Sequence, residues 1–288
     1  MSAFQNRSEL VFLYDVKRCN PNGDPLDSNR PRLDEETGRC LVTDVRLKRT
    51  IRDYLINKGY DGGAKGDVFV RTEAITGEKR SEAYADSKEF SQKFIDVRLF
   101  GGVSAPKNVK NKTFNFTGPV QFSMGYTLNP VTKDNFIKGT GAFATSSDAI
   151  QKTFREEYNI TYGLVAFHGV VNENAAKHVN TTEGDINELT EAMWNGTKDL
   201  LTRSKKGHMP RLLVKVTYKD GFFIGDLCQL LSLNYKGDKK AENLEDVSDF
   251  ILDTTKLNAA LTKYDDKIIS ITVQTDDRLE MSAPIRTK

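Results

Sequence analysis

Cysteine is scarce in this sequence and does not occur in pairs. The chain has three cysteines, Cys19, Cys40 and Cys228, which are far apart and form no CxxC motif. An odd number of separated cysteines supports neither a disulfide framework nor a zinc ribbon. We therefore expect a protein of the reducing cytoplasm.

Long apolar segments are missing as well. No run approaches the roughly 20 apolar residues that a transmembrane helix requires, and the opening segment MSAFQNRSEL lacks the apolar core of a signal peptide. With 38% hydrophobic and 28% charged residues, the composition is that of an ordinary globular protein. We expect a soluble protein that is not exported and has no membrane partner.

A strong net charge is also absent. The chain has 42 basic and 40 acidic residues, a formal charge of +2, whereas a protein that binds nucleic acid through its overall charge usually has a pI above about 9. The charges are nevertheless clustered, because residues 198–219 hold seven bases and one acid, and residues 238–266 hold four bases and eight acids. Any contact with nucleic acid must come from local groups of cations.

Motifs of known catalytic sites are absent. The sequence has no HExxH or DxD pattern, and its glycines lack the Walker and Rossmann spacings. His168 and His208 are the only plausible imidazoles for acid–base chemistry, and a lone histidine in an apolar strand is more often a hydrogen-bonded core residue. We therefore expect no catalytic residue, no metal site and no cofactor.

The hydrophobic pattern predicts strands and helices in alternation. The expected strands are residues 9–16, 67–72, 118–128, 160–171, 211–218 and 268–274, with residues 222–227 pairing with the strand at 211–218. The expected helices are residues 44–58, 81–99, 185–203 and 255–264. This order favours one α+β domain over residues 1–288, with a ferredoxin-like or RNA-recognition-motif core and long insertions, over a doubly wound sheet.

A long polar loop is expected at residues 17–42, between the first strand and the first helix. Asn20–Pro25, which includes Asn22, has the sequence NPNGDP and is typical of a tight turn. The loop continues to Arg30 and Arg32, so asparagine side chains, backbone amides and two arginines could converge on phosphate groups. Both interpretations are open on the sequence alone.

The first helix carries a group of cations. Thr43 is its expected N-cap. Lys48 and Arg52 lie one turn apart at one edge of the apolar stripe, while Arg46 and Arg49 are expected to face further outward. Such a face is usually only solvated, but beside a helix N-terminus it could also follow a chain of phosphates.

A second basic loop follows the third expected helix. Arg203, Ser204, Lys205 and Lys206 begin the segment RSKKGHMPR, whose cations could offset the helix dipole or contact phosphates. Residues 129–159 have weak periodicity, and we expect them to form an insertion or a protruding hairpin.

Several motifs, in matching order, resemble one family. They are CNPNGDP (Cys19–Pro25), NRPR (Asn29–Arg32), TGRCLVTDVRLKRTIRDYL (Thr37–Leu55), DVRLFGG (Asp96–Gly102), TGPVQF (Thr117–Phe122) and YGLVAFHG (Tyr162–Gly169). With them the chain resembles the backbone subunit of type I CRISPR Cascade complexes, in the RAMP superfamily. It is most similar to the subtype I-B form and also resembles subtype I-C. The resemblance extends from Leu10 to Val216.

The resemblance implies a role in CRISPR antiviral defence. The family has an RNA-recognition-motif palm with finger-like insertions and a thumb hairpin, and its copies polymerise along a guide RNA (crRNA) that pairs with target DNA. The family is not catalytic. The implied partners are the crRNA, target DNA through the guide, copies of the chain itself, and the crRNA-processing, large, small and 5′-handle-binding Cascade subunits. The two clusters of opposite charge could serve RNA binding and contacts between copies.

The resemblance also implies roles for particular regions and residues. The fingers correspond to residues 60–117 and the thumb to residues 129–159. Lys48 and Arg52 match helix positions that contact guide phosphates, and Asn20 matches the first loop. The other implied RNA-binding residues are Asn22, Arg30, Arg32, Arg46, Arg49, Arg203, Ser204, Lys205 and Lys206. The alternative function is a ferredoxin-like endoribonuclease that processes precursor guide RNA through His168 or His208.

Overall fold

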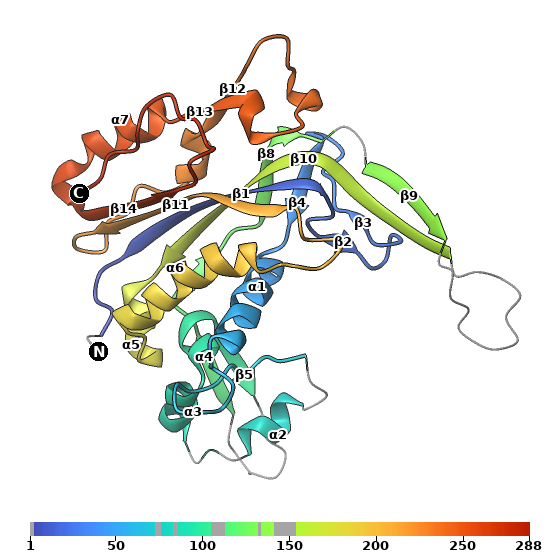
Figure 1. Ribbon diagram of the computed structural model, residues 1–288. Helices are drawn as coiled ribbons and strands as arrows, with labels where there is room; N and C mark the ends of the chain where they lie inside the picture. The colour runs from blue at the N-terminus through green and yellow to red at the C-terminus, as the bar shows by residue number, and fades with distance from the viewer. Residues whose placement is uncertain are drawn as a thin grey trace, which may run out of the picture.

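The computed structural model describes residues 3–72, 76–82, 84, 86–104, 113–131, 134–140 and 154–288. They form a mixed α+β structure around one large antiparallel sheet (Figure 1). The strand order is β14–β11–β1–β10–β8–β4, and β7 and β9 also pair with β10. The strands of this sheet are β1 (Ser8–Cys19), β4 (Arg39–Val42), β7 (Val120–Phe122), β8 (Gly125–Pro130), β9 (Asp134–Thr140), β10 (Phe154–Val171), β11 (His208–Tyr218) and β14 (Ile268–Thr275).

The two central strands, β1 and β10, are long and buried on both faces. Alternate side chains of a strand point to opposite faces, so Phe12 enters the core on one side of the sheet and Val11 enters the core on the other. The predicted strands at residues 9–16 and 160–171 are confirmed, and each is longer than expected. Residues 39–42, expected in a loop, are an edge strand paired with β8.

Helices α1 (Asp44–Asn57) and α6 (Glu183–Lys198) cover one face of the sheet (Figure 1). The apolar stripe of α1 is buried in the core on this side, which confirms the predicted helix. α6 ends at Lys198, five residues before the expected end at residue 203. The backbone N–H groups of Leu200 and Leu201 donate to Thr197 O and Asp199 O, whereas an α-helix requires the carbonyl four residues earlier. The short helix α5 (Glu173–Val179) was not expected.

Apart from the sheet strand β14, the C-terminal region, residues 219–288, packs on the opposite face and buries a second core (Figure 1). The strands at 211–218 and 268–274 and the helix near 255–264 are confirmed. Residues 222–227 form no strand, because Ile224 N and Gly225 N donate to the buried Glu9 carboxylate. The region contains η1 (Leu227–Leu230), β12 (Ser232–Tyr235), η2 (Ala241–Asn243), η3 (Val247–Asp249), β13 (Phe250–Asp253), α7 (Thr255–Lys263) and η4 (Asp265–Lys267).

Two element predictions between residues 60 and 117 are wrong. Residues 67–72 form no strand, because Phe69 N and Val70 N donate to the Asp96 carboxylate instead of a neighbouring strand. The helix expected at 81–99 is broken, because Asp86 and Phe94 have extended backbones. This part contains α2 (Gly77–Ser81), α3 (Ser87–Lys93), α4 (Ile95–Phe100), β5 (Gly101–Ser104) and β6 (Phe114–Thr117). The basic stretch at residues 106–112 lies outside the described residues.

A two-stranded arm extends from the end of the sheet. β9 pairs antiparallel with the first part of β10, from Asp134 opposite Ile160 to Thr140 opposite Phe154. Both strands run away from the body (Figure 1). Residues 141–153, which separate β9 from β10 in the sequence, lie outside the described residues. The strand expected at 118–128 is divided into β7 and β8. The first loop, residues 20–38, holds the short pair β2 (Gly23–Asp24) and β3 (Arg30–Pro31).

Candidate nucleic-acid interface

The base of the first loop is held by the loop that precedes β11, residues 199–207, which we call the β11 loop. Asn20 N donates to Ser204 O at 3.0 Å. The Lys205 ammonium donates to the carbonyl oxygens of Asn20 and Pro21, the latter at 2.8 Å. The first loop and the β11 loop, which are far apart in the sequence, therefore meet at one end of the sheet.

Asn20 and Asn22 connect the first loop internally and to α1. Asn20 is only 4% exposed, and its Nδ2 donates to Asn29 O at 2.7 Å. Asn22 Oδ1 accepts from both the backbone N–H and the hydroxyl of Thr43, each at 2.9 Å. Thr43 is the N-cap residue of α1 as predicted, but its side chain bonds to the loop and not to the helix. The start of α1 and the first loop thus form one polar unit.

Arg46 faces this unit. Its guanidinium donates to Thr50 Oγ1 at 3.0 Å and lines a small cavity together with Tyr14, Pro21 and Leu200. Burial lowers the pKa of Arg46 below its ordinary value. The expectation that Arg46 faces outward is wrong, because α1 packs this position against the ends of the central strands.

Lys205 is the second cation at this place. Burial, and then the positive charge of Arg46, lower the pKa of Lys205 from 10.5 to about 8. Its ammonium bonds to carbonyl oxygens and forms no ion pair with any carboxylate among the described residues. Arg46 and Lys205 therefore place two positive charges near this end of the sheet, and the carboxylate of Asp53 acts on Arg46 electrostatically.

The other predicted cations of α1 are each paired with a carboxylate. The pairs are Lys48–Asp44 at 2.8 Å, Arg49–Asp53 at 2.7 Å and Arg52–Asp96 at 2.8 Å. Lys48 and Arg52 also lie over the Phe100 ring, so they share one edge of the helix as predicted. Asp96 is almost fully buried, and its pairing with Arg52 ties α1 to α4.

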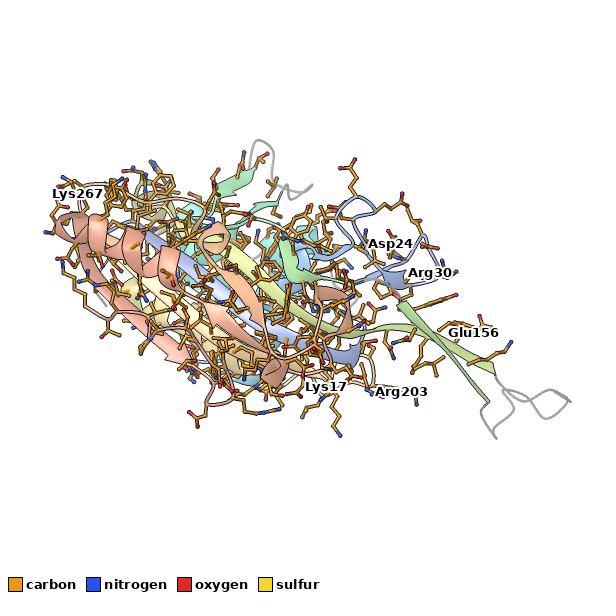
Figure 2. All side chains as sticks on the ribbon, turned by 90° about the horizontal axis from the view of Figure 1, so that it is seen from above. Lys17, Asp24, Arg30, Glu156, Arg203 and Lys267 are labelled. Atoms are coloured by element: carbon orange, nitrogen blue, oxygen red, sulfur yellow. The ribbon has the colours of Figure 1, made fainter. Side chains whose placement is uncertain are left out.

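Arg30 and Arg203 lie on opposite sides of the arm (Figure 2). The Arg30 guanidinium lies 4.6 Å from the centre of the Tyr158 ring, and Arg203 bonds to both carboxylate oxygens of Glu157, at 2.9 and 3.2 Å. Neighbouring strand residues point to opposite faces, so the first loop and the β11 loop contact the two faces of the arm at its base.

The arm contributes residues that the sequence reasoning missed. Tyr158 also packs against Phe136, with ring centres 5.0 Å apart, and Phe136 is 50% exposed. The weak periodicity of residues 129–159 gives no sign of this contact. Glu157 and Tyr158 can be assigned to opposite faces of the arm only because β10 runs without a break from the arm into the core.

The remaining predicted residues have simpler surroundings. Arg32 pairs with Asp24 inside the first loop, with Nη1 3.0 Å from Oδ2. Ser204 and Lys206 are exposed in the β11 loop. The structure therefore gathers Asn20, Asn22, Arg46, Ser204 and Lys205 at one place and leaves Lys48, Arg49 and Arg52 along the helix.

The two histidines are hydrogen-bonded and lie apart. Their partners on β1, Val11 and Val16, are five residues from each other, or about 17 Å along an antiparallel strand. His168 Nε2 lies 2.7 Å from the buried Glu9 carboxylate. His208 bonds to a backbone carbonyl, and burial followed by a nearby ammonium lowers the pKa of His208 to about 3.

The described residues contain no group of three His, Cys, Asp or Glu side chains that could hold a metal ion. In the same residues, every helix is too short or too polar to cross a membrane.

Known proteins match the chain over most of its length. A family model described as "CRISPR-associated protein Cas7" matches residues 6–255. A curated Haloferax volcanii protein with the same description is 36% identical, over 96% of this chain and 88% of that protein.

Solved structures are similar in fold. One, described as "CRISPR RNA-guided surveillance complex", has a TM-score of 0.53 at 15% identity, over 96% of this chain and 95% of that one. Another, described as the same complex "pre-nicking", has a TM-score of 0.52 at 10% identity, over 96% of both chains. From the matched family model and the curated relative, we conclude that the chain belongs to the Cas7 family of CRISPR-associated proteins.

Proposed function

We propose that this chain is the non-catalytic backbone subunit of a Cascade-type CRISPR surveillance complex in the cytoplasm, of subtype I-B. Its copies polymerise along a crRNA, hold the RNA backbone and present the bases for pairing with target DNA. Membership of the Cas7 family and a fold similar to chains of RNA-guided surveillance complexes support this role. The further partners are the crRNA-processing, large, small and 5′-handle-binding subunits.

The topology supports an RNA-recognition-motif palm. The chain passes through β1, α1, β7 with β8, β10, α6 and β11, and the spatial order is β11–β1–β10–β8. This arrangement matches the split βαβ order of ferredoxin-like folds, with both helices on one face. In this scheme residues 60–117 are the fingers, and residues 129–159, which include the arm, are the thumb.

The observation that carries the proposal is the meeting of three polar segments at the base of the arm. The first loop, the start of α1 and the β11 loop bring asparagine amides and cations together there. Cations and amides bind phosphates whatever the bases are, so such a surface follows an RNA backbone without reading its sequence.

The alternative of an endoribonuclease is not favoured. His168 is held by a buried carboxylate, and the lowered pKa of His208 makes it a poor acid or base near neutral pH. The two imidazoles also lie too far apart to act on one bond. Incubation with labelled precursor RNA, with and without EDTA, is expected to leave the RNA intact, and specific cleavage lost in His168→Ala would support the enzyme.

RNA binding is expected to be indifferent to sequence and sensitive to salt. Single-stranded RNAs of equal length and unrelated sequence should bind with similar affinity, and the logarithm of the association constant should fall linearly with the logarithm of salt concentration. The expected slope is about −0.7 for each neutralised phosphate. Filter binding over a salt series measures both properties.

Lys48→Ala is the variant that tests the helix edge. It is expected to weaken binding and to make the salt slope shallower by about 0.7, whereas Lys256→Ala, on α7 across the sheet, should change neither. Arg52 is left in place, because its pairing with the buried Asp96 is part of the fold. An unchanged slope in Lys48→Ala would remove that residue from the interface, and strong preference for one RNA sequence would contradict backbone binding.

A further inference from the structure

A cavity of about 420 Å³ lies on the face of the sheet that the C-terminal region covers, opposite α1. We call it the β8 trough, because residues of β8 and of the segment just before it line one side. Its floor is largely apolar. Met124 and Tyr126 are 50% and 39% exposed, and Ala166 of β10 lies opposite Tyr126 in the strand register. A cavity of this volume has room for a small ligand or for a few residues of a peptide.

One end of the β8 trough offers hydrogen-bond acceptors. His168 Nε2 lies 2.7 Å from the Glu9 carboxylate, so Nε2 carries a proton, and in the neutral imidazole Nδ1 is an acceptor. Gly225 N donates to the same oxygen of Glu9, which places Asp226 at this end. Neither His168 Nδ1 nor the Asp226 carboxylate has a hydrogen-bond or ion-pair partner among the described residues. A ligand must therefore bring a donor, and an ammonium or guanidinium group suits a carboxylate best.

The other end of the β8 trough offers a cation. Arg39, on β4, lies beside the far end of β8 in the strand register and lines the cavity. Within the described ranges its guanidinium forms no hydrogen bond or ion pair, although its charge interacts with that of Asp34. The β8 side of the trough runs from Ser123, which bonds to the backbone of His168, to Leu128. Its extended length is about 17 Å. An anion is therefore favoured at the end opposite to the acceptors.

β12 borders the β8 trough with an unpaired edge. In the part of the chain that the structure describes, β12 pairs with β13 alone. Lys236 N, just after β12, donates to Asp249 O on the β13 side. Because backbone donors alternate in direction along an antiparallel strand, the N–H groups of Leu233 and Tyr235 point away from β13, and both residues line the trough. Free backbone groups beside a cavity are the arrangement that binds an extended peptide by strand addition.

We propose that the β8 trough is a docking site for an extended peptide segment of a partner protein, with a basic residue at Asp226, apolar residues over Tyr126 and an acidic residue at Arg39. The peptide adds to the free edge of β12 through main-chain hydrogen bonds, and the complementary charges at the two ends fix its direction. About five residues span the distance between the two ends. The trough lies across the sheet from α1, so this inference goes beyond the proposed RNA binding and does not depend on it.

Selection from a library of random peptides of about twelve residues, displayed on phage and applied to the immobilised full chain, tests the inference. We expect the selected peptides to carry a basic and an acidic residue that flank about four apolar or β-branched positions. The strongest binder is then synthesised with a fluorescent label, and fluorescence anisotropy gives its affinity for the full chain in solution.

Two variants assign the peptide to the trough. Asp226→Asn and Arg39→Gln should each weaken its binding about tenfold, because each removes a charge-assisted contact. Asparagine tolerates the left-handed backbone at residue 226, where φ is 48°. Asp277→Asn is the matched control, since Asp277 is an exposed carboxylate of the C-terminal region that does not line the trough, and it should bind as the parent does.

Charge reversal distinguishes lost recognition from a misfolded variant. Arg39→Glu should bind the selected peptide weakly and should recover affinity when lysine replaces the acidic residue of the peptide. A chain that does not fold cannot show this exchange of preference, so the comparison stands even where one variant is destabilised.

Several outcomes would overturn the inference. A library that yields no binder is one, and equal affinity of the selected peptide for the parent, Asp226→Asn and Arg39→Gln is another. Displacement of the peptide by single-stranded RNA would place it at the nucleic-acid interface instead. Self-association of the parent chain that Arg39→Glu abolishes would assign the trough to a second copy of the chain.

Discussion

The Arg211→Met variant is expected to lose about 3–5 kcal/mol of its free energy of unfolding. The Arg211 guanidinium on β11 lies 2.9 Å from Asp15 on β1 and also contacts Asp276, which follows β14. Arg211 and Asp15 are both buried, so the substitution leaves an uncompensated carboxylate between β1 and β11. Urea unfolding at neutral pH, followed by circular dichroism, measures the loss.

A double-mutant cycle distinguishes the ionic contribution from a loss of packing. Burial raises the pKa of Asp15 even though the charge of Arg211 acts to lower it. An unpaired carboxylate at this position is therefore costly, and Asp15→Asn combined with Arg211→Met should be more stable than Arg211→Met alone. A double variant that shows the plain sum of the two single losses would contradict this explanation.

Glu9→Gln is expected to cost about 3–4 kcal/mol, since it places an amide group among hydrogen-bond donors. Glu9 is fully buried. One of its carboxylate oxygens lies 2.7 Å from His168 Nε2 and accepts from Gly225 N, and the other accepts from Tyr218 Oη at 2.6 Å and from Ile224 N. Glutamine keeps only one of these two acceptors.

The same substitution should release the start of the C-terminal region. Because Glu9 holds the backbone at Ile224 and Gly225, hydrogen exchange of these two amides should be faster in Glu9→Gln than in the parent chain. Glu242→Gln, which changes an exposed carboxylate in the same region, is the matched control and should leave both the exchange and the stability unchanged. Unaltered exchange at residues 224 and 225 in Glu9→Gln would show that other contacts hold this segment.

The contribution of Glu9 should also depend on pH. Burial alone would raise the pKa of Glu9, but hydrogen bonds from His168 and Tyr218 outweigh it and hold the pKa below 4.5. A lowered carboxylate pKa stabilises the fold above the ordinary value, and this stability disappears as the pH falls through the folded value. The difference in stability between the parent and Glu9→Gln should therefore shrink only as the pH is lowered below 4.5, through the folded pKa of Glu9.

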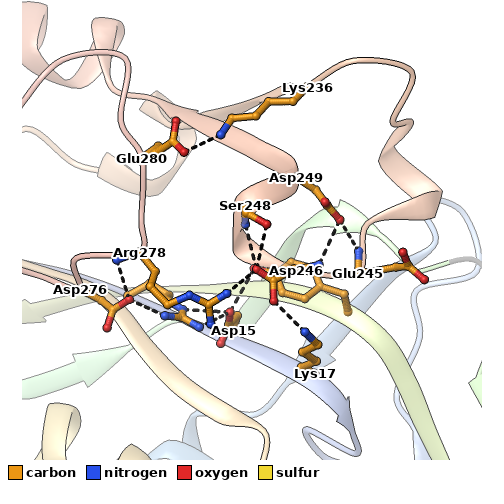
Figure 3. Close-up of polar contacts among 12 residues, drawn as sticks. Asp15, Lys17, Lys236, Glu245, Asp246, Ser248, Asp249, Asp276, Arg278 and Glu280 are labelled. Atoms are coloured by element: carbon orange, nitrogen blue, oxygen red, sulfur yellow. Dashed lines mark hydrogen bonds and ion pairs between the residues drawn. The ribbon is translucent and has the colours of Figure 1, made fainter.

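The acidic segment at residues 238–266 is largely neutralised within the chain. Asp246 pairs with Lys17 at 2.7 Å and with Arg278 at 2.6 Å (Figure 3). Burial would raise the pKa of Asp246, but hydrogen bonds from Lys17 and Ser248 hold it below 3.8. The Asp246 carboxylate therefore attaches the C-terminal region to the end of β1, and its negative charge is balanced within the chain.

Elements whose local pattern agrees with their packing were predictable from the sequence. The stripe that Leu47 and Ile51 begin in α1 is buried as its spacing requires, and β14 lies where its apolar run predicts. The apolar runs at residues 67–72 and 222–227 suggest strands that do not form, because their backbone N–H groups donate to the carboxylates of Asp96 and Glu9, which are distant in the sequence. Hydrophobic periodicity contains no information about such distant acceptors.

The candidate site was predictable in composition but not in geometry. The sequence shows cations in the first loop, in α1 and in the β11 loop. The structure shows which of these cations form an ion pair with a carboxylate. Lys48 and Arg52 are paired with acids, whereas Arg46 lines a small cavity with Pro21 of the first loop and Leu200 of the β11 loop. That difference depends on where α1 packs, and a helical pattern defines only the face that is buried.

Sequencing the RNA that copurifies with the chain from its native host tests the central claim most directly. The account predicts RNA of uniform length in which a constant repeat-derived part flanks a variable spacer, bound by several copies of the chain. Purification without RNA, or with a mixture of cellular RNAs of no common structure, would contradict it.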